Sequence, residues 1–160
     1  MRARPPGDRT ALLGTWTLVS FRLLRHNGEE AYPFGKRAKG RLVYADDGSF
    51  CVQLMRPHRP PSASIDPMQC TLGEMERFFK GYIAYYGTFQ VYPPSSLVVH
   101  HVEGALHPNW EGQAFKRYYS LSDGLLELKT PYVAWDGDDR AVATITWKAV
   151  SRGEAGTPPA

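Results

Sequence analysis

The chain has 160 residues, of which 42% are hydrophobic and 22% charged, a composition typical of a soluble globular protein with one domain. The formal net charge of +3 is small, and no stripe of Lys and Arg alternates with the aromatic residues, which argues against nucleic-acid binding. No apolar run approaches the ~20 residues of a membrane span, and the first residues lack the apolar segment of a secretory signal. We therefore expect a cytoplasmic protein with no membrane partner.

Short runs of alternating apolar and polar residues, separated by turn signals, follow one another along most of the chain. This pattern is typical of an all-β barrel or sandwich. Asp46-Asp47-Gly48 is a strong hairpin signal between two of the runs, because glycine tolerates the positive φ of a tight turn. We predict strands at 15–24, 40–45, 49–56, 82–92, 97–106, 113–121, 125–130 and 140–150.

Residues 71–81 form the one good helix candidate. Thr71 suits an N-cap, and Glu74 follows three residues later, which is the spacing of a capping box. The four prolines of 57–67 prevent a regular element just before it. The helix either covers the mouth of a barrel as a lid or packs against the outer wall.

Eight antiparallel strands joined by short connections favour a closed barrel over a sandwich. Such a barrel is filled by its own side chains or holds one small ligand. We predict an all-β fold: an eight-stranded antiparallel up-and-down barrel with one short helix between strands 3 and 4. This domain covers residues 12–150, after a flexible arm at 1–11 and before a disordered tail at 151–160.

Gly14-Thr15-Trp16 resembles the G-x-W signature of lipocalins. A more specific series follows: "YPFG…KGRLVYADDGSFCVQLMRPHRP", "GYIAYYGTFQV", "VVHHVEGALHPNWEGQAFKRYYSL" and "LLELKT". Together these segments, from residue 12 to about 149, are similar to the lipocalin-like domain family of small intracellular bacterial and fungal barrels. The resemblance implies a calycin-type barrel with an internal cavity. It leaves function open, because such barrels include carriers and cofactor-free cyclases of natural-product pathways.

Two adjacent histidines lie in the predicted strand 97–106, and adjacent strand residues point to opposite faces. The face with His101 and Glu103 carries two polar groups, so we expect it to point outward. His100 then points into the barrel, with Val98, Val102, Gly104 and Leu106 on its face. A bulge at Gly87 or Gly104 would shift this register.

The same alternation places Tyr85, Arg117 and Tyr119 inside the barrel near His100. Arg117 offers a fork of donors to a carboxylate or enolate, an imidazole can take and return a proton, and a tyrosine can donate to an oxyanion. We take His100, Arg117 and Tyr85 as candidate catalytic residues for enolisation, dehydration or cyclisation of a polyketide-like substrate. The alternative is a structural network that satisfies the same groups inside the wall.

Trp110 lies in a turn shaped by Pro108 and Gly112, where it either covers the cavity mouth or plugs it. We expect Arg56 at the open rim, facing an anionic ligand or solvent. The residues that we predict to bind ligand are Tyr119, Phe89, Trp110, Gln53, Met55, Arg56 and Trp147. His101 and Glu103 have a spacing that can chelate a metal, but no third ligand is fixed by the sequence, so we predict no metal and no cofactor.

These patterns predict a protein that binds a hydrophobic, oxygenated small molecule in a barrel cavity. Our first hypothesis is a cofactor-free isomerase or cyclase of secondary metabolism. The alternatives are a non-catalytic carrier or sequestration protein and a structural subunit with a filled barrel. The sequence leaves the oligomeric state open, including a homodimer.

Overall fold

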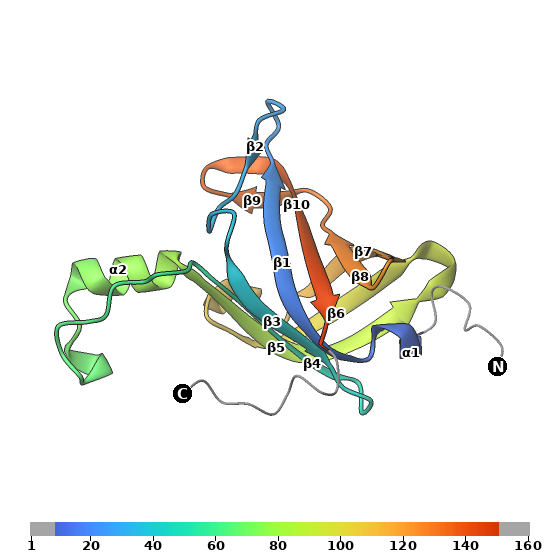
Figure 1. Cartoon of the computed structure of the whole chain (residues 1–160), viewed down its shortest axis with the longest axis horizontal. Coiled ribbons are helices and arrows are strands. Elements are labelled where there is room, and N and C mark those ends of the chain that lie inside the picture. Colours follow the sequence, from blue (N-terminus) through green and yellow to red (C-terminus); the bar gives the residue numbers. More distant parts are fainter. Residues whose placement is uncertain (1–8, 151–160) are drawn as a thin grey trace.

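We describe residues 9–150 of a computed structural model. The predicted tail lies outside the described residues, as does the predicted arm up to residue 8. The last part of that arm contributes to a short helix, α1 (Arg9–Leu12). Ten strands and the helix α2 (Leu72–Lys80) follow. The strands are β1 (Gly14–Leu24), β2 (Glu30–Ala31), β3 (Lys39–Tyr44), β4 (Ser49–Met55), β5 (Tyr82–Tyr92), β6 (Leu97–Ala105), β7 (Ala114–Ser122), β8 (Leu125–Lys129), β9 (Val133–Trp135) and β10 (Asp138–Ala149) (Figure 1).

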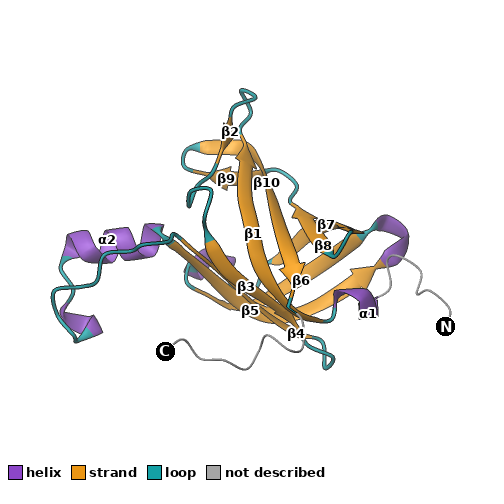
Figure 2. Cartoon of the chain, viewed as in Figure 1, coloured by secondary structure: helices purple, strands orange, loops and turns teal. Residues whose placement is uncertain are grey.

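Eight of the strands close into an antiparallel barrel in the order β1-β3-β4-β5-β6-β7-β8-β10, with β10 pairing back to β1. The predicted barrel is therefore confirmed, and strands dominate the molecule (Figure 2). The two remaining strands, β2 and β9, pair with the mouth ends of β1 and β10. The sequence did not indicate them, because two or three residues are too few to show an alternating pattern. They also shift the numbering, so that the helix α2 lies between β4 and β5.

The two ends of the barrel differ. At one end α1 and the β3–β4 hairpin close the interior: the Trp16 indole donates to the Leu12 carbonyl at 2.9 Å, and Arg9 donates to the Asp46 carbonyl at 2.7 Å. Longer connections surround the opposite end, which we call the mouth. They are residues 25–38, 56–81, 106–113 and 130–137.

A bulge interrupts the pairing of β5 with β6 between Tyr86 and Gly87. A side chain at Gly87 would collide with the His101 carbonyl oxygen, so the close approach requires glycine. His100 pairs with Phe89 before the bulge and points inward as predicted. Beyond the bulge the prediction is wrong: Gly104 faces outward beneath the Tyr86 ring, because the extra residue reverses the alternation.

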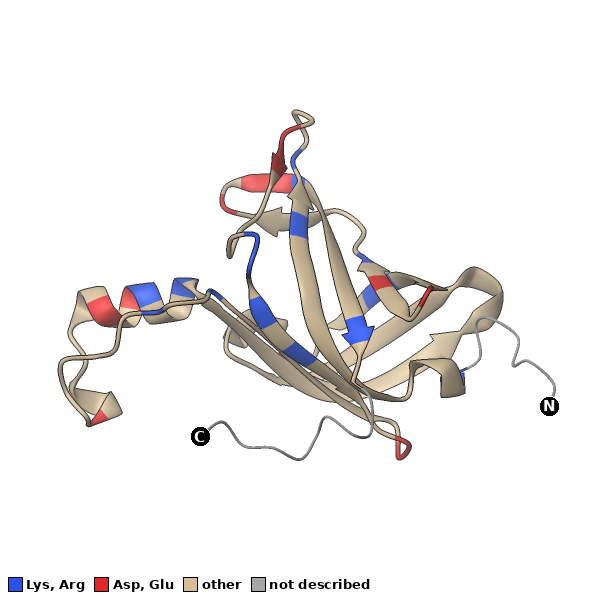
Figure 3. Ribbon diagram, viewed as in Figure 1, with Lys and Arg blue, Asp and Glu red and all other residues tan. Residues whose placement is uncertain are grey.

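Residues 56–81 form an arm that projects away from the barrel (Figure 1). The predicted capping box is present: the Thr71 hydroxyl accepts from the Glu74 amide at 3.2 Å, and the Glu74 carboxylate accepts from the Thr71 amide at 2.9 Å. The helix is neither a closed lid nor packed on the wall, and only its last turn reaches the mouth. None of the helices in residues 9–150 is long and apolar enough to cross a membrane. Lys and Arg are spread over the arm and several strands (Figure 3).

Candidate ligand site at the barrel mouth

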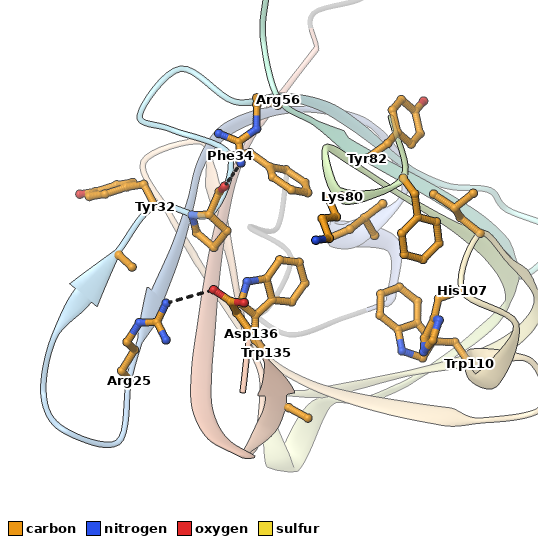
Figure 4. Close-up of a pocket in the computed structure, with 16 residues that line it drawn as sticks. Arg25, Tyr32, Phe34, Arg56, Lys80, Tyr82, His107, Trp110, Trp135 and Asp136 are labelled. Carbon is orange, nitrogen blue, oxygen red and sulfur yellow. Dashed lines mark hydrogen bonds and ion pairs between the residues drawn. The ribbon is translucent and has the colours of Figure 1, made fainter. Parts of the chain in front are cut away.

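A pocket of about 640 Å³ opens at the mouth of the barrel (Figure 4). Its size is that of sites that hold one small organic molecule. The connections at the mouth, the short strands β2 and β9, and the last turn of α2 supply most of its lining. Figure 4 shows Phe34 and Trp135 on one side and Trp110 and His107 on the other, with Lys80 between them.

The first wall of the pocket is a cluster of three aromatic rings. Phe34 meets Phe21 edge to face at 5.5 Å, and Trp135 packs on both rings at 5.6 and 6.2 Å. Phe21 belongs to β1 and is buried, as is Phe34. Because Trp135 lies on β9, this short strand fixes the wall to the barrel.

Trp110 forms the second wall, in a 3₁₀ turn over Pro108–Trp110. Its ring packs edge to face on His107 at 5.5 Å, on Phe115 at 5.7 Å and on Tyr85 at 5.8 Å. Phe79 of α2 extends the wall outward by an edge contact with His107 at 6.3 Å. The pocket is therefore bounded by aromatic faces on two sides, which suits a flat, apolar ligand.

The polar groups of the pocket lie at its rim. Arg25 is 3.9 Å from Asp136, and the Lys80 ammonium is 2.7 Å from Glu76, which raises the pKa of Lys80. Arg56 donates to the Pro33 carbonyl at 2.8 Å and lies over a ring of the first wall. Of these three rim cations, Arg56 alone forms no ion pair with a carboxylate of residues 9–150.

Beneath the second wall, the interior of the barrel holds a buried imidazole. His100 is 1% exposed, stacks on Phe50 at 4.3 Å, and has its Nε2 2.6 Å from the Tyr44 hydroxyl. Burial lowers the pKa of His100 well below its usual value, with a further contribution from Arg117, and burial raises the pKa of Tyr44. Both groups are therefore neutral near pH 7. The His100 Nδ1 atom is buried and has no hydrogen-bond partner among the described residues.

Arg117 lies in the same interior and is 8% exposed. Its guanidinium donates to the Lys116 carbonyl at 2.9 Å, reaches the Tyr85 hydroxyl at 3.5 Å, and covers the Phe115 ring at 5.0 Å. These partners are a carbonyl, a hydroxyl and a ring face. The positive charge has no carboxylate partner within residues 9–150.

The sequence profile of the lipocalin-like domain family matches residues 13–150, nearly the whole barrel just described. The chain belongs to the lipocalin-like domain family. A relative from Aspergillus oryzae, named 4'-hydroxy-3'-methoxypropiophenone carrier protein ppsC, is 31% identical over 109 residues. The match covers 63% of this chain and 96% of the relative.

The lipocalin-like barrel brings His100, Arg117 and Tyr85 together in its interior, with the Tyr85 and His100 rings 6.1 Å apart. None of the three lines the mouth pocket, which Trp110 separates from them. Of the other residues predicted to bind ligand, two line the pocket, Arg56 and Trp110. Three face the interior below it: Phe89, Tyr119 and Trp147.

Gln53 and Met55 do not reach the pocket or the interior. They alternate along β4 with the buried Phe50, Val52 and Leu54, so their side chains point to the outer face of the lipocalin-like barrel. Sequence reasoning also missed Phe34, Trp135 and Phe79. The available signal was that these aromatic residues lie in turn-rich segments. A large apolar side chain in a loop packs against another apolar surface, which here is the edge of the cavity.

Proposed function

We propose that this protein is a carrier that binds a hydrophobic, oxygenated aromatic molecule in the mouth pocket. The pocket of about 640 Å³ between two aromatic walls carries the proposal. Its apolar depth and polar rim match a molecule with a flat ring and a few oxygen atoms. The carrier relative supports the choice, because its named ligand is a methoxylated phenol with a ketone.

The ring of such a ligand lies between Trp110 and Trp135, with edge-to-face contacts like those that the walls already make. Ligand oxygen atoms that lie at the rim can accept hydrogen bonds from Arg56 and Lys80. In this arrangement most of the apolar surface of the ligand leaves water, which supplies the driving force for binding.

Calorimetric titration with 4'-hydroxy-3'-methoxypropiophenone tests this proposal. We expect one site per chain, and a loss of affinity of about tenfold or more in Trp135→Ala, since an aromatic anchor is removed. Tyr118→Ala is the matched control, because Tyr118 is an exposed ring on the outer face of β7. The proposal fails if the wild-type protein does not bind the compound, or if Tyr118→Ala weakens binding as much as Trp135→Ala.

A second candidate is cofactor-free isomerisation or cyclisation of the bound molecule. The neutral, buried His100 with its unpartnered Nδ1 favours it, because such an imidazole can accept a proton from the carbon next to a ketone. Arg117 and Tyr85 would then stabilise the enolate oxygen. For this reaction the substrate has to pass the Trp110 ring.

Deuterium exchange distinguishes the two candidates. The rate at which the ketone's α-protons exchange in D₂O is followed by proton NMR with and without protein. Acceleration that His100→Gln abolishes supports catalysis. If the compound binds but its α-protons exchange no faster than in buffer, the protein is a carrier and does not catalyse this step.

A further inference from the structure

We infer that the mouth pocket selects acidic aromatic molecules and binds them as their anions, because the buried Arg117 beneath it has no carboxylate partner within residues 9–150. The ligand class is an aromatic ring with an ionisable oxygen, such as a phenol conjugated to a carbonyl. The inference rests on the proposed function, since it names the charge state of the ligand in the same pocket. The inference also goes beyond the proposed function, since a carrier for neutral molecules does not need a buried positive charge beneath its pocket.

Arg117 is the buried cation of the barrel interior. Among residues 9–150 its guanidinium contacts neutral groups: the Lys116 carbonyl at 2.9 Å, the Tyr85 hydroxyl at 3.5 Å and the Phe115 face at 5.0 Å. An arginine stays ionised when buried, and a buried charge without a partner is costly. An incoming anion removes part of that cost, whereas an incoming cation adds to it.

The strands beside β7 point their carboxylates away from Arg117: Glu103 of β6 is exposed, and Glu127 of β8 alternates with the buried Leu126 and Leu128. His100 of β6 and Tyr44 of β3 are neutral, as shown above. The buried carboxylate of Asp138 lies at the start of β10, where it accepts hydrogen bonds from the His26 amide at 3.0 Å and the Arg140 amide at 2.9 Å. The Asp138 carboxylate is therefore bound to these amides and does not pair with Arg117.

A ligand in the pocket lies close enough to feel this charge. The guanidinium covers Phe115, which packs on Trp110 at 5.7 Å, and Trp110 lines the pocket. The two intervening rings, Phe115 and Trp110, are aromatic and partly buried, so the field is screened less than it would be in open solvent. The rim is also positively charged, because the pocket lining includes Arg25, Arg56 and Lys80 but one carboxylate, Asp136.

The proton balance of binding follows from this field. A phenol that enters the pocket loses its hydroxyl proton to the buffer and remains as the phenolate. No bond to carbon changes and no electron is transferred. Near a pH at which the free phenol is mostly protonated, each binding event therefore releases up to one proton.

The test is an absorbance titration of 4'-hydroxy-3'-methoxypropiophenone, free and bound, because the phenolate of such a ketone absorbs at longer wavelength than the phenol. We expect binding to lower the pKa of the phenol by about half a unit or more, since an opposite charge acts on the ligand from behind two aromatic rings. In Arg117→Met most of this shift should disappear. Arg41→Gln is the charge-matched control, because Arg41 is exposed on the outer face of β3.

The outcomes separate the inference from the proposed function. If the compound binds with its phenol pKa unchanged or raised, the inference is wrong and the carrier stands. If neither this compound nor 3',4'-dimethoxypropiophenone binds at any pH, the proposed function is wrong. Should Arg117→Met not fold, calorimetry of the wild-type protein in two buffers with different ionisation enthalpies measures the released protons directly. Absence of release at a pH within about half a unit below the pKa of the free phenol, where the free and bound phenol differ in protonation, also overturns the inference.

Discussion

The closed end and the mouth of the barrel are built by the same eight strands but are packed in different ways. At the closed end Tyr44, Phe50, Phe89 and His100 form one cluster of rings, all 4% exposed or less. At the mouth, rings of comparable size stand around a pocket, and Phe79 remains 48% exposed.

This difference shows where the barrel derives its stability and where it can bind. Side chains that alternate along regular strands fill the closed end. At the mouth, the strands have ended, and loops bring aromatic groups to the edge of the cavity without filling it. A substitution at one end should therefore affect folding, and the same substitution at the other end should affect binding.

Phe50→Ala should have the largest effect on stability. Removal of this buried ring takes away the stack on His100 and leaves a cavity, which costs about 3–5 kcal/mol of unfolding free energy. Urea denaturation followed by circular dichroism measures the loss. A loss below about 1 kcal/mol would mean that the closed end is not the tightly packed region described above.

Asp138→Asn should have the next largest effect, although the residue lies near the mouth. Hydrogen bonds from the His26 and Arg140 amides lower the pKa of Asp138 to about 2. A carboxyl with a pKa below its unfolded value of ~3.9 stabilises the fold above that value, and this stabilisation is lost as the pH falls through the folded pKa. We expect the variant to be less stable than the wild-type protein at pH 7 and to lose most of its difference from the wild-type protein below pH 2.

Denaturation across pH provides the check for this carboxyl. Between pH 5 and 2 the wild-type protein should lose more unfolding free energy than Asp138→Asn does. If the unfolding free energy of the two proteins changes equally with pH, the hydrogen bonds of Asp138 do not stabilise the contact between β10 and the segment after β1.

His100→Gln tests the neutral imidazole of the closed end. Because burial lowers the pKa of His100, the unfolded chain binds a proton near pH 6.5 that the folded chain does not. Stability should therefore fall as the pH drops below about 6.5, by up to ~1.4 kcal/mol per pH unit from this group. Glutamine can keep the hydrogen bond to Tyr44 but does not titrate. If the variant and the wild-type protein show the same pH dependence from 7.5 to 5.5, the imidazole is not held neutral.

Phe79→Ala should have the smallest effect on stability, within about 0.5 kcal/mol, because nearly half of the ring is exposed. Binding of 4'-hydroxy-3'-methoxypropiophenone should still weaken severalfold, since Phe79 lines the pocket. Urea denaturation and calorimetric titration of one sample measure both quantities. A large loss of stability without a loss of affinity would reverse the expected roles of the two ends.

The sequence predicted the regular part of the molecule well for a physical reason. Each barrel strand has one buried and one exposed face, so alternation identified the strands and the inward direction of His100, and the capping box identified the helix. The same rule erred at Gly104, because the bulge beside Gly87 depends on how two strands approach each other. No single strand carries that information.

The candidate site was less predictable, because most of the pocket belongs to segments without a repeating pattern. Phe34 and Trp135 come from a turn and from a three-residue strand, and they meet only after the chain has closed the barrel. Arg56 and Trp110 were found because each lies directly at a strand end or in a short connection between strands. Whether His100 and Arg117 act on a ligand remains a prediction.

Two tryptophans lie at each end of the barrel, and their indole N–H signals test the central claim most directly. Trp110 and Trp135 line the mouth pocket, whereas Trp16 and Trp147 are buried near the closed end. In a ¹H–¹⁵N spectrum titrated with 4'-hydroxy-3'-methoxypropiophenone, the signals of Trp110 and Trp135 should shift and those of Trp16 and Trp147 should stay. Shifts confined to Trp16 and Trp147, or no shift at saturating ligand, would contradict a binding site at the mouth.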